Sequence, residues 1–330
     1  MGHARLDPLT GRWVILAPGR ARRPDTVAPS LPGPGADAGP TSDDCPFCPG
    51  NEHLTPPEIA RTGPGAAGTP RWRTRVFPNR YPIVDGPGVD PGAGPADLLR
   101  SARRVGGAHE VVVLSPDHGR SLGLLERAQV VEVLAVLRDR ARAHTARGRG
   151  FTQVFVNHGA EGGASLTHPH AQLIAVDLEP PVVLDEVARI TTPEGCLICR
   201  EIERHAGEDA LVVASTDAEL WCPWASGTAF EMLLAPRRHR ARFEDAADEL
   251  PAVAELLRHG LARLDRVVAG APYNLAVHSR PAALTADYHW HIHVWPRLQR
   301  EAGFERGSGL LVDVVDPAQA AALLRGSGPP

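Results

Sequence analysis

The 330-residue chain contains no lysine, so all 35 of its basic side chains are arginines. The absence of lysine excludes Schiff-base catalysis and the phosphate-binding lysine of a P-loop. Long apolar runs are also missing: none approaches the ~20 residues of a membrane span, and the N-terminus has no signal-peptide pattern. We therefore expect a cytoplasmic protein without a membrane partner. The net charge of −4 supplies no basic field, so nucleic acid is not an expected partner either.

Cysteine is scarce, with five residues in the chain. Four of them form two Cys-x-x-Cys pairs, Cys45/Cys48 and Cys196/Cys199, whereas Cys222 has no partner in sequence and is expected to serve packing. In a cytosolic chain such pairs indicate metal or redox chemistry rather than disulfides. A thioredoxin-like pair would stand at a strand-to-helix junction. The first pair instead lies between Pro/Gly-rich segments, which favours metal.

The two halves of the chain repeat one pattern. Two histidines are 50 residues apart in each half: His118 and His168 in the first, His239 and His289 in the second. Each half also opens with a Cys-x-x-Cys pair. We interpret the repeat as an internal duplication. A length of 330 residues suits two units of ordinary size, and we place them at residues 1–178 and 179–330.

In each half, the sequence pattern predicts the order strand, helix, strand, strand. Apolar residues at i, i+3, i+4 and i+7 indicate the first helix, and a similar apolar face between residues 253 and 268 indicates the second. We therefore expect an α+β fold in which both units contribute to one antiparallel sheet. The predicted strands cover residues 109–115, 151–156, 173–176, 230–235, 273–277 and 288–294, and the first helix contains Val130, Val133, Leu134 and Leu137.

One stretch, residues 157–172, organises the chain. It follows an apolar strand, passes through a Gly-rich loop and enters a second strand at His168-Pro-His170-Ala-Gln172. Period-two alternation places His168, His170 and Gln172 on one face of that strand. Three aligned polar groups beside a loop with backbone N–H groups suit a phosphate. The alternative is a polar strand edge beside a flexible turn.

This stretch resembles the histidine-triad superfamily and, within it, the galactose-1-phosphate uridylyltransferase branch. In that branch the second histidine of His-x-His-x-Gln attacks the α-phosphorus of a nucleotide sugar, and the glutamine marks transferases. The resemblance extends from about Asp7 to about Pro317 and implies two tandem histidine-triad-like units.

The resemblance implies that His170 is the nucleophile, which forms a nucleotidyl-histidine and releases sugar 1-phosphate. Gln172 and the N–H groups of Gly163, Ala164 and Ser165 would hold the phosphoryl oxygens, and Ser165 could add its hydroxyl. The loop of the second half, at residues 279–283, lacks this Gly-Gly-Ala-Ser cradle. We expect that half to be inactive.

The resemblance also implies substrate contacts outside the central stretch. For Arg20 and Arg23, the planar guanidinium group suits bidentate contacts with phosphate, and the alternative is a solvated basic loop. A turn-forming asparagine beside proline is the alternative for Asn79. The predicted contacts are Arg20, Arg23, Asn79, Asn157, Phe304 and Glu305.

Two structural zinc ions per chain are expected from the resemblance and the duplication. A structural zinc takes four soft or borderline ligands in a closed tetrahedron. The first set is Cys45, Cys48, His118 and His168, and the second is Cys196, Cys199, His239 and His289. Some family members hold iron in the second half instead, at positions that match Glu186, His278, His291 and His293. Because the second Cys-x-x-Cys is present, we expect zinc there, with core packing as the alternative for those three histidines.

The expected partners are therefore a nucleotide sugar and a sugar 1-phosphate or phosphate. We expect a nucleotidyltransferase of the UDP-glucose:hexose-1-phosphate uridylyltransferase type. The alternatives are a nucleotide-sugar phosphorylase of the ADP-glucose type and a zinc-stabilised nucleotide-binding protein without turnover. The sequence leaves open the base, the sugar and the acceptor. The family resemblance also implies a homodimer.

Overall fold

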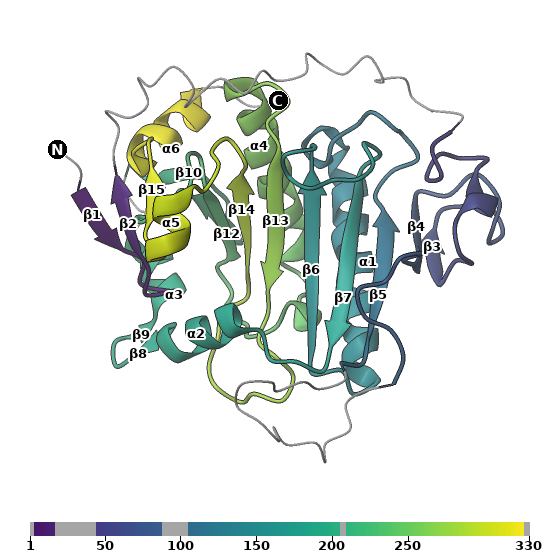
Figure 1. The fold of residues 1–330 in the computed structure, drawn as a ribbon, viewed down its shortest axis with the longest axis horizontal. Coiled ribbons are helices and arrows are strands. Elements are labelled where there is room, and N and C mark those ends of the chain that lie inside the picture. Colours follow the sequence, from purple (N-terminus) through teal and green to yellow (C-terminus); the bar gives the residue numbers. More distant parts are fainter. Residues whose placement is uncertain (1–2, 17–43, 88–104, 205–208, 327–330) are drawn as a thin grey trace.

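The computed structural model describes residues 3–16, 44–87, 105–204 and 209–326. Arg20 and Arg23 lie outside these ranges, so the predictions for them are not placed. Within the described chain the main feature is a ten-stranded sheet (Figure 1). All of its strand pairs are antiparallel. The predicted α+β class is confirmed.

The sheet is arranged symmetrically about its centre, where β6 and β13 pair and place Val154 opposite Val277. On one side of this pair stand β7, β5, β4 and β3, and on the other stand β14, β12, β11 and β10. The two halves of the chain thus contribute strands in corresponding order to one sheet. The strands are β3 (Ala60–Thr62), β4 (Thr74–Pro78), β5 (Gly107–Val113), β6 (Phe151–His158), β7 (His170–Val176), β10 (Leu211–Ala214), β11 (Ala218–Trp221), β12 (Met232–Pro236), β13 (Tyr273–His278) and β14 (His291–Pro296).

Two of the predicted strands begin later than expected. Phe230 has a φ of 61°, so the chain turns there and β12 begins at Met232. The residues from Tyr288 to Trp290 precede the ladder of β14, which starts at His291. Both strands otherwise match their predicted positions. The unit boundary at residues 178/179 stays a prediction.

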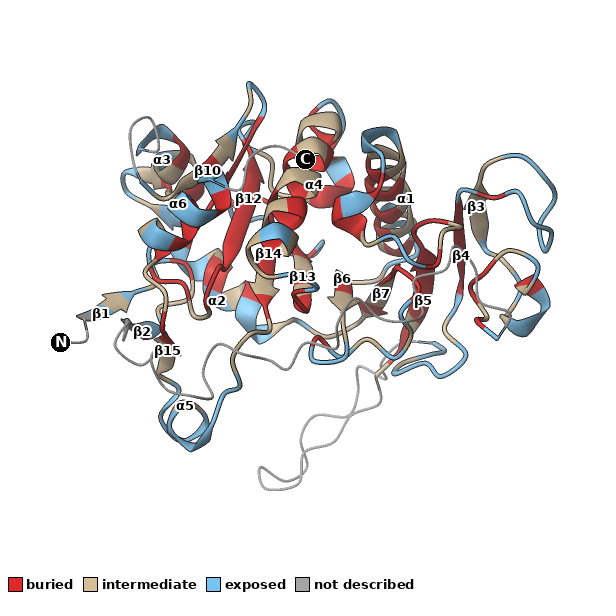
Figure 2. Ribbon diagram, turned by 90° about the horizontal axis from the view of Figure 1, so that it is seen from above, coloured by how far each residue is buried: buried red, intermediate tan, exposed pale blue. Residues whose placement is uncertain are grey.

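One face of the sheet is apolar and is covered by two long helices, α1 (Arg127–Ala146) and α4 (Leu250–Val267). Figure 2 shows both helices on the same side of the strands. The α1 residues that the sequence predicted to face inward are buried, and they join one core with residues of both halves, such as Leu173 and Ile292. Because this core continues across the β6–β13 pair, its packing joins the halves.

The opposite face of the sheet carries the polar residues. Alternation along each strand places His170 and Gln172 on this face of β7, because their neighbours Ala171 and Leu173 pack toward the helices. A small cluster around Phe47 and Phe77 covers one end of this face, and a second cluster around Ile198 and Trp221 covers the other. The candidate site lies on this face.

The remaining elements lie around the sheet. The other helices are η2 (Glu52–Leu54), η3 (Leu122–Leu124), α2 (Pro181–Arg189), α3 (Leu197–Arg204), η4 (Phe243–Asp245), α5 (Gly303–Ser308) and α6 (Pro317–Gly326). The other strands are β1 (His3–Leu6), β2 (Trp13–Leu16), β8 (Thr191–Thr192), β9 (Gly195–Cys196) and β15 (Leu311–Asp313), with β15 parallel to β2. Among the described residues, no helix combines the length and apolar character that crossing a membrane requires.

Candidate active site

His170 is the first residue of β7 and is held in one orientation. Its Nδ1 lies 2.9 Å from the backbone oxygen of His168, and a carbonyl oxygen can only accept, so Nδ1 carries the proton. Burial lowers the pKa of His170, which favours the neutral ring. In a neutral imidazole protonated at Nδ1, the lone pair is on Nε2. The Nε2 atom of His170 could therefore attack without an activating base.

Phe47, inside the first Cys-x-x-Cys, supports this ring. Its ring centroid lies 5.4 Å from that of His170 with an interplanar angle of 67°, and 5.5 Å from that of Phe77 on β4. Phe47 is buried, as are both cysteines that flank it. The segment from Cys45 to Cys48 thus packs directly against the candidate nucleophile. The orientation of His170 therefore depends on the conformation of this segment.

Gln172 meets a residue that the sequence analysis did not assign to the site. His109 on β5 has Nε2 at 2.8 Å from Gln172 Oε1 and at 3.1 Å from Asn79 Nδ2. The structure therefore places Asn79 beside Gln172 through His109, and its contact with substrate stays a prediction. Period-two alternation could have placed His109 on the same face as Val111, but only the pairing of β5 with β7 places it beside Gln172.

The Gly-rich loop closes on itself. Gly163 has a φ of 82°, a conformation that requires glycine or costs energy for other residues. The Gly163 N–H donates to the Ala160 oxygen (N···O 2.9 Å), and the Ala164 N–H donates to the Gly159 oxygen (3.1 Å). This differs from the expectation that both amides hold phosphoryl oxygens, because each already has an acceptor within the turn. Ser165 is exposed at the end of the loop.

Asn157 is fixed by the second half of the chain. Asn274 on β13 donates from Nδ2 to Asn157 Oδ1 at 2.9 Å and to the backbone oxygen of Gly162 at 2.6 Å. Because the Asn157 oxygen is engaged, its amide nitrogen is the end that faces the Gly-rich loop. A Cβ atom at position 163 would lie 3.8 Å from that nitrogen. The sequence analysis missed Asn274. No local pattern pointed to Asn274, which lies opposite Asn157 only because β6 pairs with β13.

Phe304 and Glu305 are not brought to His170 within the described chain. Both lie on α5, which Figure 1 places beside β15 and β2, on the far side of β13 and β14 from β7. Phe304 is 51% exposed. The Glu305 carboxylate accepts from the Ala302 N–H at 2.9 Å, at the start of its own helix.

The first predicted metal set is assembled. The ligand atoms of Cys45, Cys48, His118 and His168 all lie within 4.8 Å of one another. The Sγ–Nδ1 separations are 3.3 Å for Cys48–His118, 3.5 Å for Cys48–His168 and 3.7 Å for Cys45–His168. Tetrahedral zinc, with its usual Zn–S and Zn–N lengths, requires roughly 3.6 Å between S and N. His168 Nε2 lies 2.8 Å from the Ser115 oxygen, which leaves Nδ1 for a metal.

The second set is assembled in the same way. Cys196, Cys199, His239 and His289 also lie within 4.8 Å. The Sγ–Nδ1 separations are 3.3, 3.4 and 3.8 Å. His289 Nε2 donates to the Pro236 oxygen, and His239 Nε2 contacts Asp287 at 2.8 Å. Burial raises the pKa of Cys45 to about 11 and of Cys199 to about 12, so these thiols need a cation to ionise.

A third group stands apart from both cysteine sets. The ring nitrogens of His278, His291 and His293 lie within 4.8 Å of one another. Glu186 Oε2 is 2.9 Å from His278 Nδ1 and accepts from the Tyr288 hydroxyl at 2.6 Å. From the sequence, these residues and the second cysteine set were alternatives for one metal in the second half. The fold gives each its own place, because β14 carries His291 and His293 while His289 precedes the strand.

His291 is the counterpart of His170 in the second half, and its environment differs. Its Nδ1 lies 3.0 Å from the backbone oxygen of His289, which again leaves Nε2 without a proton. That Nε2 is buried and has no hydrogen-bond partner among the described residues, and the whole residue is buried. Burial lowers the pKa of His291 to about 3. Such burial keeps a nucleotide away from this atom, which fits the expectation that the second half is inactive; that expectation stays a prediction.

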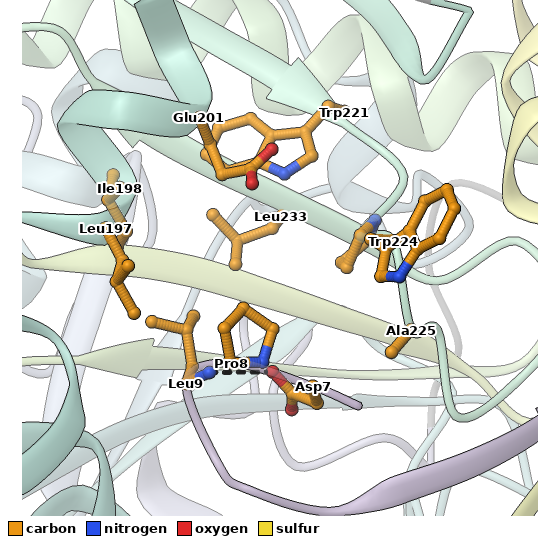
Figure 3. Close-up of a pocket in the computed structure, with 11 residues that line it drawn as sticks. Asp7, Pro8, Leu9, Leu197, Ile198, Glu201, Trp221, Trp224, Ala225 and Leu233 are labelled. Carbon is orange, nitrogen blue, oxygen red and sulfur yellow. Dashed lines mark hydrogen bonds between the residues drawn. The ribbon is translucent and has the colours of Figure 1, made fainter. Parts of the chain in front are cut away.

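An apolar pocket lies elsewhere on the molecule (Figure 3). Its lining comes from the turn after β1, from α3 and from β11 and β12, and includes Leu9, Ile198, Trp221, Trp224 and Leu233. No residue of β6, β7 or the Gly-rich loop contributes to it. Its small volume of about 40 Å³ holds little more than a water molecule or two. His170 and Gln172 do not line this pocket.

Comparison with known proteins agrees with this arrangement. A sequence model described as galactose-1-phosphate uridyl transferase, N-terminal domain, matches residues 1–180, and one for a domain of unknown function (DUF4921) matches residues 123–324. The chain is 30% identical to ADP-glucose phosphorylase from Arabidopsis thaliana, over 97% of this chain and 92% of that protein. It is 28% identical to galactose-1-phosphate uridylyltransferase from Haemophilus influenzae, over 91% of this chain and 85% of that one.

The fold agrees as well. It matches the crystal structure of an Arabidopsis thaliana ADP-glucose phosphorylase with bound ADP-glucose at a TM-score of 0.80 and 27% identity, over 98% of this chain and 99% of that one. This similarity covers both halves of the sheet. The chain belongs to the galactose-1-phosphate uridylyltransferase family and is a nucleotidyltransferase.

Proposed function

We propose that the chain transfers a nucleoside monophosphate from a nucleotide sugar of the UDP-glucose class to a hexose 1-phosphate, through a covalent nucleotidyl group on His170. The proposal rests on one observation: His170 has Nδ1 tied to the His168 oxygen and Nε2 left with its lone pair, on the strand face that carries Gln172. A fixed, neutral imidazole suits attack on phosphorus.

The reaction has two displacements. Nε2 of His170 forms a bond to the α-phosphorus, and the bond from that phosphorus to the bridging oxygen breaks, so sugar 1-phosphate leaves with the electron pair. A phosphate oxygen of the acceptor then attacks the same phosphorus, and the N–P bond breaks. Negative charge on the phosphoryl oxygens would be met by the amides of Gln172 and Asn157 and by the Ser165 hydroxyl.

The metals act through structure in this proposal. Zinc at the two Cys₂His₂ sets would fill closed sites without an open position, so it would stabilise the fold and hold His168 and Phe47 beside the nucleophile. The Glu186 group, with three imidazoles and a carboxylate, suits iron or zinc. No step of the transfer uses that group.

A second candidate is a nucleotide-sugar phosphorylase of the ADP-glucose type, in which inorganic phosphate is the acceptor. It is favoured by the 30% identity and the TM-score of 0.80 to ADP-glucose phosphorylase. Both candidates share the first displacement and differ in the base and in the acceptor.

The first displacement is tested by incubating the pure protein with nucleotide sugar and no acceptor. One nucleotide per active site should become attached, in an acid-labile and base-stable bond. His170→Gly should abolish the attachment and retain metal and fold, whereas His53→Gly, which removes an exposed imidazole, should label normally. If the wild-type protein binds nucleotide sugar but is never labelled, it transfers in a ternary complex or only binds. Labelled protein offered galactose 1-phosphate or inorganic phosphate then distinguishes the two candidates.

We also propose that the active protein is a cytoplasmic homodimer. None of the five cysteines, all of which lie in the described part of the chain, forms a disulfide, which fits a reducing compartment. Phe304 and Glu305 lie apart from His170 in their own chain, which fits a site that a second copy completes. Mixing a His170→Gly chain with a Glu305→Ala chain should restore activity if each dimer then holds one intact site. If two inactive variants never complement, the sites lie within single chains.

A further inference from the structure

The mechanism leaves one buried imidazole beside the catalytic amide unexplained. His109 lies on β5, 5% exposed, and its side chain faces Gln172 diagonally across the β5–β7 ladder, in which Val111 is the direct partner of Gln172. It is not a metal ligand in any of the three groups. Its place suggests that it acts on the glutamine.

The hydrogen bonds of the ring determine its tautomer. The backbone N–H of Ile83 points at His109 Nδ1, with an N···N distance of 3.2 Å. A backbone N–H can only donate, so Nδ1 accepts and the single proton of the neutral ring is on Nε2. Burial lowers the pKa of His109, which disfavours a second proton on the ring.

The tautomer in turn determines the orientation of the Gln172 amide. His109 Nε2, as a donor, requires an acceptor at 2.8 Å, and the atom there is Gln172 Oε1. Once the oxygen is engaged, the NH₂ group is the end of the amide that remains for a ligand. Phosphoryl oxygens accept hydrogen bonds and do not donate them, so the opposite orientation would set two acceptors against each other.

A competing arrangement also exists in this cluster. Asn79 Nδ2 lies 3.1 Å from the same ring nitrogen, and Asn79 Oδ1 accepts from the Tyr81 N–H at 2.8 Å. If His109 Nε2 accepted from Asn79, Nδ1–H would confront the Ile83 N–H, and the Gln172 amide would reverse. The backbone N–H cannot rotate away, whereas the Asn79 amide can direct its hydrogens elsewhere. The first arrangement is therefore the more stable one.

We propose that His109 is a positioning residue, which holds Gln172 Oε1 so that the glutamine amide presents its NH₂ group to the phosphoryl oxygens at His170. This inference rests on the proposed nucleotidyl transfer. It explains how glutamine, which is symmetric in shape at its amide end, acts as a donor in one fixed orientation.

The first test measures the rate of His170 labelling in a single turnover. His109→Leu should slow labelling by about 10- to 100-fold. This is at most the effect of removing one preorganised hydrogen-bond donor, about 100- to 1000-fold, because Gln172 itself is still present. His109→Gln can place an amide N–H near the original Nε2 and should recover most of that rate. His53→Leu, which removes an exposed imidazole, is the control for the loss of a histidine as such.

Non-additivity separates positioning from a structural effect. In a Gln172→Ala background, His109→Leu should change the labelling rate by less than about twofold, because the group through which it acts is gone. A full additional loss in the double variant would mean that His109 acts by another route. Equal losses for His109→Leu and His109→Gln would also overturn the proposal, provided that thermal unfolding and metal content match those of the wild type.

A second test does not depend on activity. ¹⁵N spectra of histidine-labelled protein, assigned by comparison with His109→Leu, should show a protonated Nε2 and an unprotonated Nδ1 for His109. A protonated Nδ1 would overturn the proposal even if labelling is normal. If the wild type is never labelled, the proposed transfer fails, and this spectrum still decides the hydrogen-bond arrangement.

Discussion

The strand that carries His109 is anchored on its other face by a buried ion pair, and the strength of this anchor can be estimated. Glu110 accepts from Arg140 Nε at 2.8 Å and from a terminal Arg140 nitrogen at 2.6 Å, and lies 3.0 Å from His144 Nε2. The side chains of Glu110 and Arg140 are 4% and 12% exposed. Burial opposes the charge of Glu110, but the bonds from Arg140 and His144 outweigh it and lower its pKa from 4.5 to about 2.

This pKa shift predicts the effect of Glu110→Gln. At 1.36 kcal/mol per unit, the shift corresponds to about 3 kcal/mol of stability, an order-of-magnitude value. Because the folded-state pKa is depressed, this stability is fully present above the unfolded-state pKa of 4.5 and is lost as the pH falls through 2. Glu110→Gln should therefore lower the free energy of unfolding by about 3 kcal/mol between pH 5 and 7, with little change across that range.

The assay is urea unfolding followed by circular dichroism on zinc-saturated protein. Glu132→Gln is the matched control, because Glu132 pairs with Arg73 at 2.8 Å with side chains 22% and 55% exposed, and exposed pairs contribute under about 1 kcal/mol. Arg140→Met should also destabilise, and the double variant should lose less than the sum of the two. A loss for Glu110→Gln no larger than that for Glu132→Gln would refute the reasoning, as would additive losses in the double variant.

Three further predictions concern the site. Metal analysis should find zinc at both cysteine sets. Cys45→Ser should lose one equivalent of zinc and be less stable, and Cys196→Ser should lose a different equivalent. A Cys45→Ser protein that keeps its full metal content and melting temperature would contradict the assignment. Gln172→His should slow transfer and increase hydrolysis of nucleotide sugar without acceptor, since imidazole can relay a proton to water; hydrolysis at the wild-type rate would show that the glutamine does not exclude it. Asn274→Leu should raise KM more than it lowers kcat, because Asn157 and the Gly-rich loop lose their shared donor; an unchanged KM in steady-state assays would remove Asn274 from the binding site.

Several features of the fold follow from local sequence. The α1 helix has the apolar spacing of its inward face, and β7 has the alternation that puts His170 and Gln172 together. These are short-range properties, because helical and strand periods act over a few residues. The repeated Cys-x-x-Cys pairs and histidine spacing predicted two sets of two cysteines and two histidines. The ligand atoms of each set lie within 4.8 Å of one another. The order of strands outward from the β6–β13 pair reflects the same repeat.

Other features depend on which strands become neighbours. His109 and Gln172 are 63 positions apart, and Asn157 and Asn274 are 117 apart, so no local period relates them. Their contacts exist because β5 pairs with β7, and β6 with β13, in one register; a shift by one residue would send each side chain to the opposite face. The internal hydrogen bonds of the Gly-rich loop likewise depend on its folded conformation.

The sequence by itself therefore determined the candidate nucleophile and its strand, the two candidate Cys₂His₂ sets and the repeated spacing, since these are properties of residue type and spacing. Only the tertiary structure decided which partners orient the amides of Gln172 and Asn157, and that the Glu186 group and the second cysteine set occupy separate places. The physical reason is that hydrogen bonds and metal coordination act over about 2 to 3 Å. Distances that short between remote residues are fixed by sheet register and packing.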